Sequence, residues 1–399
     1  MTLHRRDLLM AGGSAAAMLA LSGKAHAQAA GTASAADLSP YLALDREQRI
    51  NVINLREIEI EAQEILPAES FAYIAGGAGD ERTLRQNEEA FGEWIIEPDY
   101  LAGTPRTPDV SAALLGESLS LPVITAPMGG HGRAHARKEL PTIEGTNAFG
   151  TLYTTTTVAN LPMEEIAAAG PGPKWFQIYF PQDRGFAREQ LQRAKAAGYT
   201  AIVITVDSTT FSNRERPTRL GLPSPDLGTG TVPQTPGIDP LTAGILKADL
   251  DWDDVALCAS ETGLPVLVKG VLTPKLASEC VQRGCAGIWV SNHGGRGIDR
   301  LAPAISALPR IADAVAGRVP IVIDSGFRRG QDVFMALALG ATTVALGRPI
   351  LYGLALGGSQ GVQAVYQRLK TELQMVMQLA GTPNLAAIRP DHLKRLREL

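Results

Sequence analysis

The residues best suited to chemistry stand together in the segment 291–296 (SNHGGR), directly after the apolar run Gly287–Val290. His293 can take up or release a proton near neutral pH, and Arg296 can bind a carboxylate or phosphate through two parallel hydrogen bonds. The glycines leave room for a ligand or a loop to approach the backbone. A strand-to-helix turn with a structurally satisfied histidine is the alternative interpretation, so residues elsewhere have to decide between the two.

Three further residues favour the chemical interpretation. Lys269 follows the apolar run Leu264–Val268. It could form a Schiff base with a carbonyl substrate, or it could stabilise a negative charge on a bound cofactor. Asp207 could orient His293, and Arg214 could bind a second carboxylate oxygen. A base, an acid to orient it and two carboxylate-binding groups suit the oxidation of a 2-hydroxy acid.

A regular alternation of strands and helices is expected to position these residues. Eight apolar, β-branched runs are each followed by a segment compatible with a helix, which predicts a parallel sheet with right-handed crossovers. Eight such units close a (β/α)8 TIM barrel, which we predict here. A doubly wound sheet is the alternative, but the Gly-x-Gly-x-x-Gly turn after its first strand is missing. The predicted strands are Leu121–Ala126, Thr151–Thr157, Trp175–Phe180, Ala201–Val206, Leu264–Val268, Gly287–Val290, Val319–Ile323 and Thr342–Leu346.

Polar residues stand at the ends of nearly all these runs, and in a barrel of this type the catalytic groups lie at the carboxyl ends of the strands. The turns after strands seven and eight contain glycines and arginines, in the segments 324–330 (DSGFRRG) and 345–349 (ALGRP). Barrels commonly bind phosphate at these two positions. A phosphate-bearing ligand is therefore expected there, although solvated arginines at helix starts are the alternative.

The remaining chain adds an N-terminal helical extension and a long insertion. Helical periodicity predicts helices over 54–66 and 83–91, before the barrel. A Pro/Gly-rich stretch at 216–249 interrupts the pattern after strand four, on the active-site face, and is interpreted as a lid. We assign residues 28–50 to a linker and 51–399 to the barrel domain. The formal net charge of −4 argues against nucleic acid as a partner, and three cysteines are too few for a disulfide framework or an evident metal site.

The first residues resemble an export signal. Arg5 and Arg6 precede a mildly apolar run, and Ala25-His26-Ala27 provides a small-residue cleavage site. We expect residues 1–27 to be a twin-arginine signal peptide and the mature protein to be periplasmic. A membrane anchor is the rival, but the apolar run is shorter than the roughly 20 residues that span a bilayer. No stable membrane span is therefore expected in the mature chain.

Several of these segments, taken together, resemble a known family. The segments 291–296 (SNHGGR), 264–270 (LPVLVKG), 324–333 (DSGFRRGQDV) and 338–349 (ALGATTVALGRP) are similar to the FMN-dependent 2-hydroxy acid oxidases and dehydrogenases. The segments 127–135 (PMGGHGRAH) and 174–179 (KWFQIY) are most similar to the bacterial lactate oxidase branch of that family. The likeness extends from about residue 54 to about residue 386.

The resemblance implies a role for each matching residue. His293 would accept the hydroxyl proton of the substrate, and Asp207 would stabilise the protonated imidazole. Arg214 and Arg296 would hold the substrate carboxylate, with hydroxyl contacts from Tyr73 and Tyr179. Lys269 would stabilise the anionic reduced flavin. The residues expected to bind FMN, in addition to Lys269, are Pro127, Met128, Gly129, Thr156, Gln177, Thr205, Ser291, Asp324, Gly326, Arg328, Gly347 and Arg348.

The favoured interpretation is an FMN-dependent enzyme that converts an (S)-2-hydroxy acid, lactate or a similar acid, to the 2-oxo acid. Oxygen and a quinone-type carrier both remain candidates for the electron acceptor. A non-redox FMN barrel such as an isomerase, and a Schiff-base lyase on a phosphate-binding barrel, are the alternatives. The family resemblance also implies a homo-oligomer, as a tetramer.

Overall fold

The structure is a computed structural model that describes residues 44–210, 212–220 and 246–398. The predicted signal peptide at 1–27 lies outside the described residues, and only the two ends of the predicted lid at 216–249 lie within them. Of the predicted linker, residues 44–50 are described, and they form neither helix nor strand.

Eight parallel strands form the predicted barrel, so the fold prediction is confirmed. Neighbouring strands are hydrogen-bonded in the order β4-β11-β10-β9-β8-β7-β6-β5. The two end strands meet where the Thr125 N–H donates to Leu152 O (2.9 Å). Each strand coincides with one of the eight predicted runs to within a few residues. The strands are β4 (Val123–Thr125), β5 (Tyr153–Thr156), β6 (Lys174–Ile178), β7 (Ile202–Thr205), β8 (Val266–Val271), β9 (Gly287–Val290), β10 (Ile321–Ile323) and β11 (Thr343–Leu346).

The strands are buried on both faces because alternate side chains point to the barrel interior and to the surrounding helices. Trp175 and Trp289 belong to the interior cluster, whereas Ile202 and Ile204 pack with the helices. The hairpin formed by β2 (Ala112–Leu114) and β3 (Glu117–Leu119) contributes Leu114 and Leu119 to the interior cluster. The barrel is thus a packed core rather than a pore.

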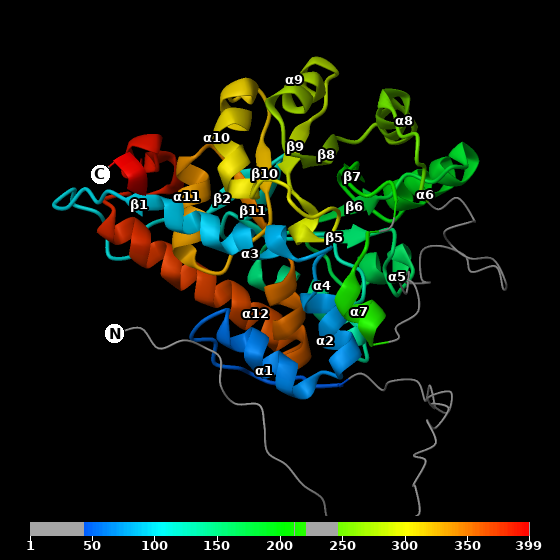
Figure 1. The fold of residues 1–399 in the computed structure, drawn as a ribbon, viewed down its shortest axis with the longest axis horizontal. Helices are drawn as coiled ribbons and strands as arrows, with labels where there is room; N and C mark the ends of the chain where they lie inside the picture. The colour runs from blue at the N-terminus through cyan, green and yellow to red at the C-terminus, as the bar shows by residue number, and fades with distance from the viewer. Residues whose placement is uncertain (1–43, 211, 221–245, 399) are drawn as a thin grey trace, which may run out of the picture. The chain divides into compact units, whose positions relative to one another are not determined.

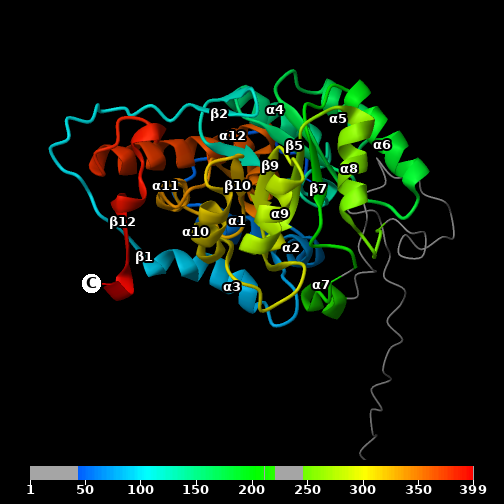
Figure 2. The same cartoon turned by 90° about the horizontal axis from the view of Figure 1, so that it is seen from above.

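Helices surround this barrel. In both views α10 and α11 lie at one end, and α5, α6 and α8 lie at the other (Figures 1 and 2). Side-chain caps fix several helix starts: Asp183 accepts from the N–H groups of Gly185 and Phe186, and Thr273 accepts from that of Leu276. The helices are α4 (Leu140–Phe149), α5 (Met163–Ala168), α6 (Arg184–Ala196), α7 (Glu215–Arg219), α8 (Trp252–Thr262), α9 (Pro274–Gln282), α10 (Ala304–Val315), α11 (Gly330–Ala338) and α12 (Arg348–Leu379).

The predicted N-terminal helical extension consists of α1 (Glu57–Ile65), α2 (Ala68–Ala75) and α3 (Arg82–Glu89). Helix α1 lies beside α12 (Figure 1). Helix α12 is kinked at Gly357 and Gly358, and its second part starts where the Glu47 carboxylate accepts from Ser359 N and Gln360 N (both 3.0 Å). Residues before α1 therefore cap a helix from the far end of the chain.

The remaining elements are short. Strand β1 (Trp94–Ile96) pairs antiparallel with β12 (Leu393–Arg395). Within the described ranges, no helix combines the length and apolar character required to cross a membrane. The 3-10 turns are η1 (Ala90–Glu93), η2 (His131–Arg133), η3 (His293–Gly295), η4 (Leu385–Ala387), η5 (Pro390–His392) and η6 (Leu396–Glu398).

Candidate active site

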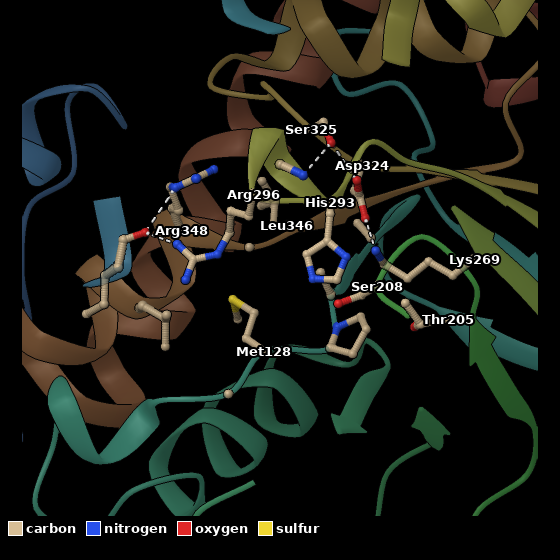
Figure 3. A pocket seen from close by; sticks show the side chains of 18 of the residues that line it. Met128, Thr205, Ser208, Lys269, His293, Arg296, Asp324, Ser325, Leu346 and Arg348 are labelled. Carbon is tan, nitrogen blue, oxygen red and sulfur yellow. Dashed lines mark hydrogen bonds and ion pairs between the residues drawn. The ribbon is translucent and has the colours of Figure 1, made fainter. Parts of the chain in front are cut away.

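A cavity opens at the carboxyl ends of the barrel strands, where the predicted residues converge. Its empty space, including the open solvent at its mouth, is about 1280 Å³. Figure 3 shows Lys269 and Thr205 at one side of the cavity and Arg348 at the other, with His293 between them. The predicted residues that line it are Tyr73, Pro127, Met128, Gly129, Tyr179, Thr205, Arg214, Lys269, His293, Arg296, Asp324, Gly326, Arg328, Gly347 and Arg348.

His293 lies in a left-handed turn directly after β9. Its φ is +60°, and Gly294 and Gly295 continue in the same backbone region. Asn292 fixes the turn from outside through two side-chain hydrogen bonds with Asn87 (2.6 and 2.9 Å). A histidine in this conformation is strained by comparison with glycine, and such strain is common at functional sites.

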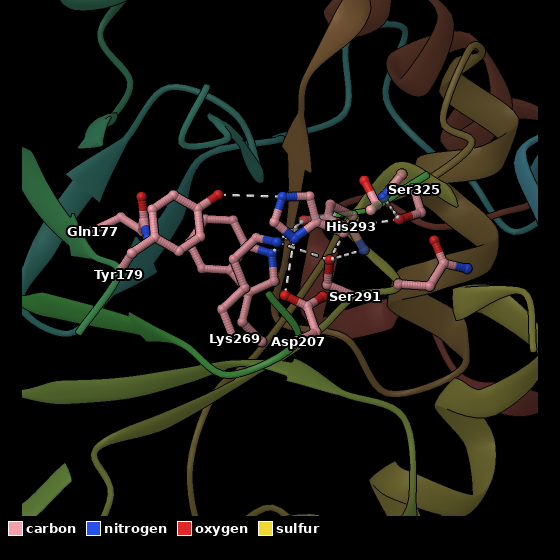
Figure 4. Close-up of polar contacts among 12 residues, drawn as sticks. Gln177, Tyr179, Asp207, Lys269, Ser291, His293 and Ser325 are labelled. Atoms are coloured by element: carbon pink, nitrogen blue, oxygen red, sulfur yellow. Dashed lines mark hydrogen bonds and ion pairs between the residues drawn. The ribbon is translucent and has the colours of Figure 1, made fainter. Parts of the chain in front are cut away.

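The imidazole lies between an acid and a phenol (Figure 4). His293 Nδ1 is 2.9 Å from Asp207 Oδ1, and Nε2 is 3.2 Å from the Tyr179 hydroxyl. Because Nδ1–H donates its hydrogen bond to the Asp207 carboxylate, the neutral ring has its lone pair on Nε2, toward Tyr179. Asp207 itself lies behind the cavity wall, so it acts on a ligand through His293.

Burial shifts the pKa values of His293, Asp207 and Tyr179. For His293, burial lowers the pKa below its ordinary value, although the nearby Asp207 carboxylate acts to raise it. Burial acts to raise the pKa of Asp207, but His293 and Lys269 together hold it below its usual range. Burial raises the pKa of Tyr179, so this phenol keeps its proton at neutral pH. The site therefore combines a neutral base, an ionised acid and a protonated phenol.

Lys269 is buried at the end of the barrel interior with an acidic partner. Its Nζ donates to Ser291 Oγ (2.9 Å) and lies 3.4 Å from Asp324 Oδ2. The Trp289 indole N–H also donates to Asp324 (2.9 Å). Lys269 is only 4% exposed, so little solvent screens the charge of its ammonium group. This positive charge can stabilise an anion that forms in the cavity.

Arg296 and Arg348 donate hydrogen bonds to backbone carbonyl groups, which the sequence did not predict. Arg296 Nη1 donates to the carbonyls of Tyr73, Ile74 and Gly76. Arg348 donates to two of the same carbonyls, those of Ile74 and Gly76. Both guanidinium groups therefore anchor the end of α2 over the cavity. Burial, together with the charges of Arg214 and Arg348, lowers the pKa of Arg296 to about 9.

Arg214 and Arg328 have different surroundings. Arg214 Nε donates to Ser212 Oγ (2.9 Å), and among the described residues its terminal nitrogens have no hydrogen-bond partner, so they can bind a ligand. Arg328 is 5% exposed and pairs with Glu88 (2.9 Å) and Glu59 (3.8 Å) on α3 and α1. The predicted phosphate-binding residue thus reaches the cavity with much of its charge already balanced.

Four predicted residues lie behind the cavity wall: Thr156, Gln177, Asp207 and Ser291. Hydrogen bonds of the residues in and behind the wall test whether FMN fits the cavity. Thr156 Oγ1 donates to Gln177 Oε1 (2.5 Å). Among the described residues, Gln177 Nε2, Thr205 Oγ1 and Arg328 Nε are buried without a hydrogen-bond partner. Unpaired buried donors destabilise a fold unless a ligand or water satisfies them. The polar edge and the phosphate of FMN offer such acceptors, so the residues present fit this cofactor.

Packing within the chain accounts for Gly326, because a Cβ there would lie 2.1 Å from Asn87 O. Its φ of +92° also favours glycine. In the described parts of the chain, no group of three His, Cys, Asp or Glu side chains is placed to hold a metal ion.

The sequence interpretation missed three serines that line the cavity: Ser208, Ser212 and Ser325. Ser325 and Ser208 each directly follow a predicted residue, and Ser212 precedes Arg214 by two positions. For Ser208 and Ser325 the position just after a strand was therefore an available signal, whereas Ser212 lies in the loop between β7 and α7.

Known proteins are similar to this chain in fold and in sequence. Residues 62–395 match the family described as FMN-dependent dehydrogenase. The L-lactate oxidase of Lentilactobacillus hilgardii is 39% identical over 364 residues, covering 90% of this chain and 98% of the relative. Glycolate oxidase 3 of Arabidopsis thaliana is 39% identical over 356 residues, covering 86% and 96%. A crystal structure of the putative lactate oxidase of Pediococcus acidilactici superposes with a TM-score of 0.84 at 42% identity, covering 89% and 98%.

These matches confirm the resemblance to the lactate oxidase branch and the prediction of FMN as cofactor. The relatives named above are all oxidases, which gives no support to the isomerase or the lyase alternative. The cavity, its basic and acidic residues and the sequence similarity over most of the chain lead to one conclusion. The chain belongs to the FMN-dependent dehydrogenase family.

Proposed function

We propose that this chain oxidises a small (S)-2-hydroxy acid to the 2-oxo acid. The observation that carries the proposal is the placement of His293, held by Asp207, in one cavity with Arg214 and Arg296. When bound, FMN supplies a two-electron acceptor. The chain's own residues then have to bind the substrate, orient it and move one proton.

His293 Nε2 takes the proton from the substrate hydroxyl. The neutral imidazole is able to do so because burial keeps its pKa low. Asp207 then stabilises the imidazolium through Nδ1. Tyr179 keeps its proton and donates a hydrogen bond toward the reacting oxygen. The proton thus moves to a group that is neutral before the reaction and charge-paired after it.

Arg214 and Arg296 hold the substrate carboxylate, and Tyr73 adds its hydroxyl. Two guanidinium groups fix the orientation of the acid, so one face of the α-carbon meets the cofactor. Lactate and glycolate are the acids in the names of the relatives, which supports a small side chain on the substrate. Oxygen is the proposed acceptor because these relatives are named oxidases; a quinone is the alternative.

Anaerobic titration of the purified yellow protein tests the proposal. An (S)-2-hydroxy acid should bleach the flavin absorbance, and its (R)-enantiomer should not. Air should then restore the colour with release of hydrogen peroxide, whereas recolouring only by a quinone analogue would identify a dehydrogenase. A yellow protein that no hydroxy acid bleaches would show that the proposed function is wrong.

The pH dependence of this step follows from the low pKa of His293. As the pH falls through this pKa, the imidazole becomes protonated and can no longer accept the hydroxyl proton. The second-order rate constant for flavin reduction should therefore fall by about tenfold per pH unit below a midpoint that lies under the ordinary histidine pKa of about 6.5. Anaerobic stopped-flow measurements would check this. An acid limb centred above about pH 7 would contradict the assignment of a buried neutral base.

Arg214→Met should weaken substrate binding and leave FMN in place. A charge-assisted hydrogen bond contributes about 1.5–3 kcal/mol, so losing two raises the substrate dissociation constant by about 10²-fold or more. The flavin spectrum and content should not change. Arg219→Met is the matched control, because Arg219 lies exposed on the same short helix and pairs with Glu215. Equal effects of the two substitutions would argue against a substrate contact by Arg214.

Export and assembly are further proposals. The twin arginines and the 25–27 cleavage sequence support a periplasmic enzyme that acquires FMN before export. A fusion of residues 1–30 to a reporter, compared with an Arg5→Lys, Arg6→Lys variant, tests this route.

We also propose a homo-tetramer on the basis of the family resemblance, and light scattering of the holoenzyme would measure its mass.

A further inference from the structure

Two non-glycine residues near the cofactor cavity adopt left-handed backbone conformations. They are His293 (φ +60°) and Ser325 (φ +83°), and they come from neighbouring strand ends, after β9 and β10. Serine is less stable than glycine in this region, so its presence suggests that the hydroxyl has a role. The hydrogen bonds of Ser325 indicate what that role is.

Ser325 connects the two turns. Its hydroxyl donates to Asp324 Oδ1 (2.7 Å) and accepts from the N–H of Gly294 (3.1 Å), the residue after His293. Ser291 makes the same pair of bonds on the other side: it donates to Asp324 Oδ1 (2.6 Å) and accepts from His293 N (3.0 Å). The Oδ1 atom of Asp324 thus accepts hydrogen bonds from two serine hydroxyls, and these hydroxyls accept from two successive N–H groups of the histidine turn.

We infer that Ser325 is a positioning residue that, with Ser291 and Asp324, clamps the His293 turn and keeps the imidazole aligned on Asp207. The inference rests on the proposed function, because it assigns His293 the role of the base. We call Ser291, Asp324 and Ser325 the serine clamp. Ser325 is its most informative member. Ser291 and Asp324 also contact Lys269, whereas within the described part of the chain Ser325 makes no hydrogen bond to Lys269.

The alignment matters because several charges act on the imidazole. Asp207 raises the pKa of His293, whereas Lys269 and Arg214 lower it. A looser turn weakens the short bond to Asp207 first, since that bond depends on geometry more than the longer-range charges do. The pKa of His293 should then fall further. Among the described residues, the charged and titratable groups that face the imidazole or its turn are Asp207 after β7, Arg214 at the start of α7, Lys269 in β8, Tyr179 after β6, Asp324 after β10 and Arg348 at the start of α12.

The test compares Ser325→Ala with Ser325→Gly. Both lose the hydroxyl, but only the glycine also relieves the backbone strain. Ala316→Gly is the control for strain relief, because Ala316 has φ +51° at the end of α10, where it caps that helix. We expect both Ser325 variants to reduce their flavin about tenfold more slowly with FMN content unchanged, and Ala316→Gly to behave as the wild type.

A second measurement requires neither substrate nor turnover. In protein with ¹³C-labelled histidine, the His293 resonance is assigned by its loss in His293→Gln and titrated by NMR. We expect its pKa to be lower by about half a unit in both Ser325 variants, and the acid limb of the reduction rate to move to lower pH by the same amount. A purely structural destabilisation would lower the melting temperature without moving the titration.

Three other outcomes would overturn the inference. If His293 titrates and the flavin is reduced in both variants as in the wild type, the clamp does not position His293. Loss of FMN with wild-type behaviour once FMN is saturating would make Ser325 a cofactor ligand instead. A change in Ser325→Gly alone would assign the effect to backbone freedom. If no hydroxy acid reduces even the wild type, the proposed function fails, and the NMR titration still decides the positioning role.

Discussion

His293→Gln is expected to retain FMN and to lose most of the rate of flavin reduction. Glutamine keeps a side chain of similar reach but cannot accept a proton, and general-base contributions are typically about 10²-fold to 10⁴-fold. The cavity wall should survive, because Asn87 and Asn292 hold the turn through side chains that this substitution does not touch. Anaerobic stopped-flow reduction with a hydroxy acid, on protein of measured flavin content, gives the result.

Chemical rescue makes this prediction sharper. His293→Ala leaves a space that imidazole from solution can enter, so added imidazole should restore part of the reduction rate, and more strongly where imidazole is neutral. Asp207→Asn should cause a smaller loss, since the base remains and only the stabilisation of its protonated form disappears. A His293→Gln variant that reduces its flavin at the wild-type rate would remove His293 from the proton transfer.

Lys269→Met is expected to slow flavin reduction by about 10²-fold, the usual effect of removing one preorganised group that stabilises a developing negative charge. Methionine fills the same volume in the barrel interior without the ammonium. Asp324 then faces the cavity as an uncompensated carboxylate, because Nζ lies 3.4 Å from its Oδ2 in the wild type. The substitution therefore removes the attraction of Lys269 for a developing anion and adds repulsion by the Asp324 carboxylate.

Two measurements check this second prediction. The reduction rate is measured as above, and the midpoint potential of the bound flavin should become more negative, because its anionic reduced form is less stable. Lys275→Met is the control, since Lys275 lies exposed on α9 just beyond the same strand. An unchanged potential in Lys269→Met would show that the ammonium does not act on the cofactor.

The sequence predicted the barrel and most of its cavity because both depend on local patterns. Apolar β-branched runs such as Ala201–Val206 form buried strands in this chain, and parallel strands bring their carboxyl ends to one edge. The residues directly after these runs, among them Lys269, His293 and Asp324, therefore had to meet there. Glycines in the turns marked the positions where the backbone passes close to its neighbours, as Gly326 does to Asn87.

Only the tertiary structure decided which groups these side chains contact. Arg296 and Arg348 both bind the carbonyls at the end of α2, more than 200 residues earlier in the chain, and Arg328 pairs with glutamates of α1 and α3. The bond between Ser325 and Gly294 likewise joins two strand ends. Periodicity and turn residues constrain each segment separately, because they reflect local backbone preferences. Contacts between distant segments depend on the register and packing of the closed barrel, so no local pattern in the sequence could have specified them.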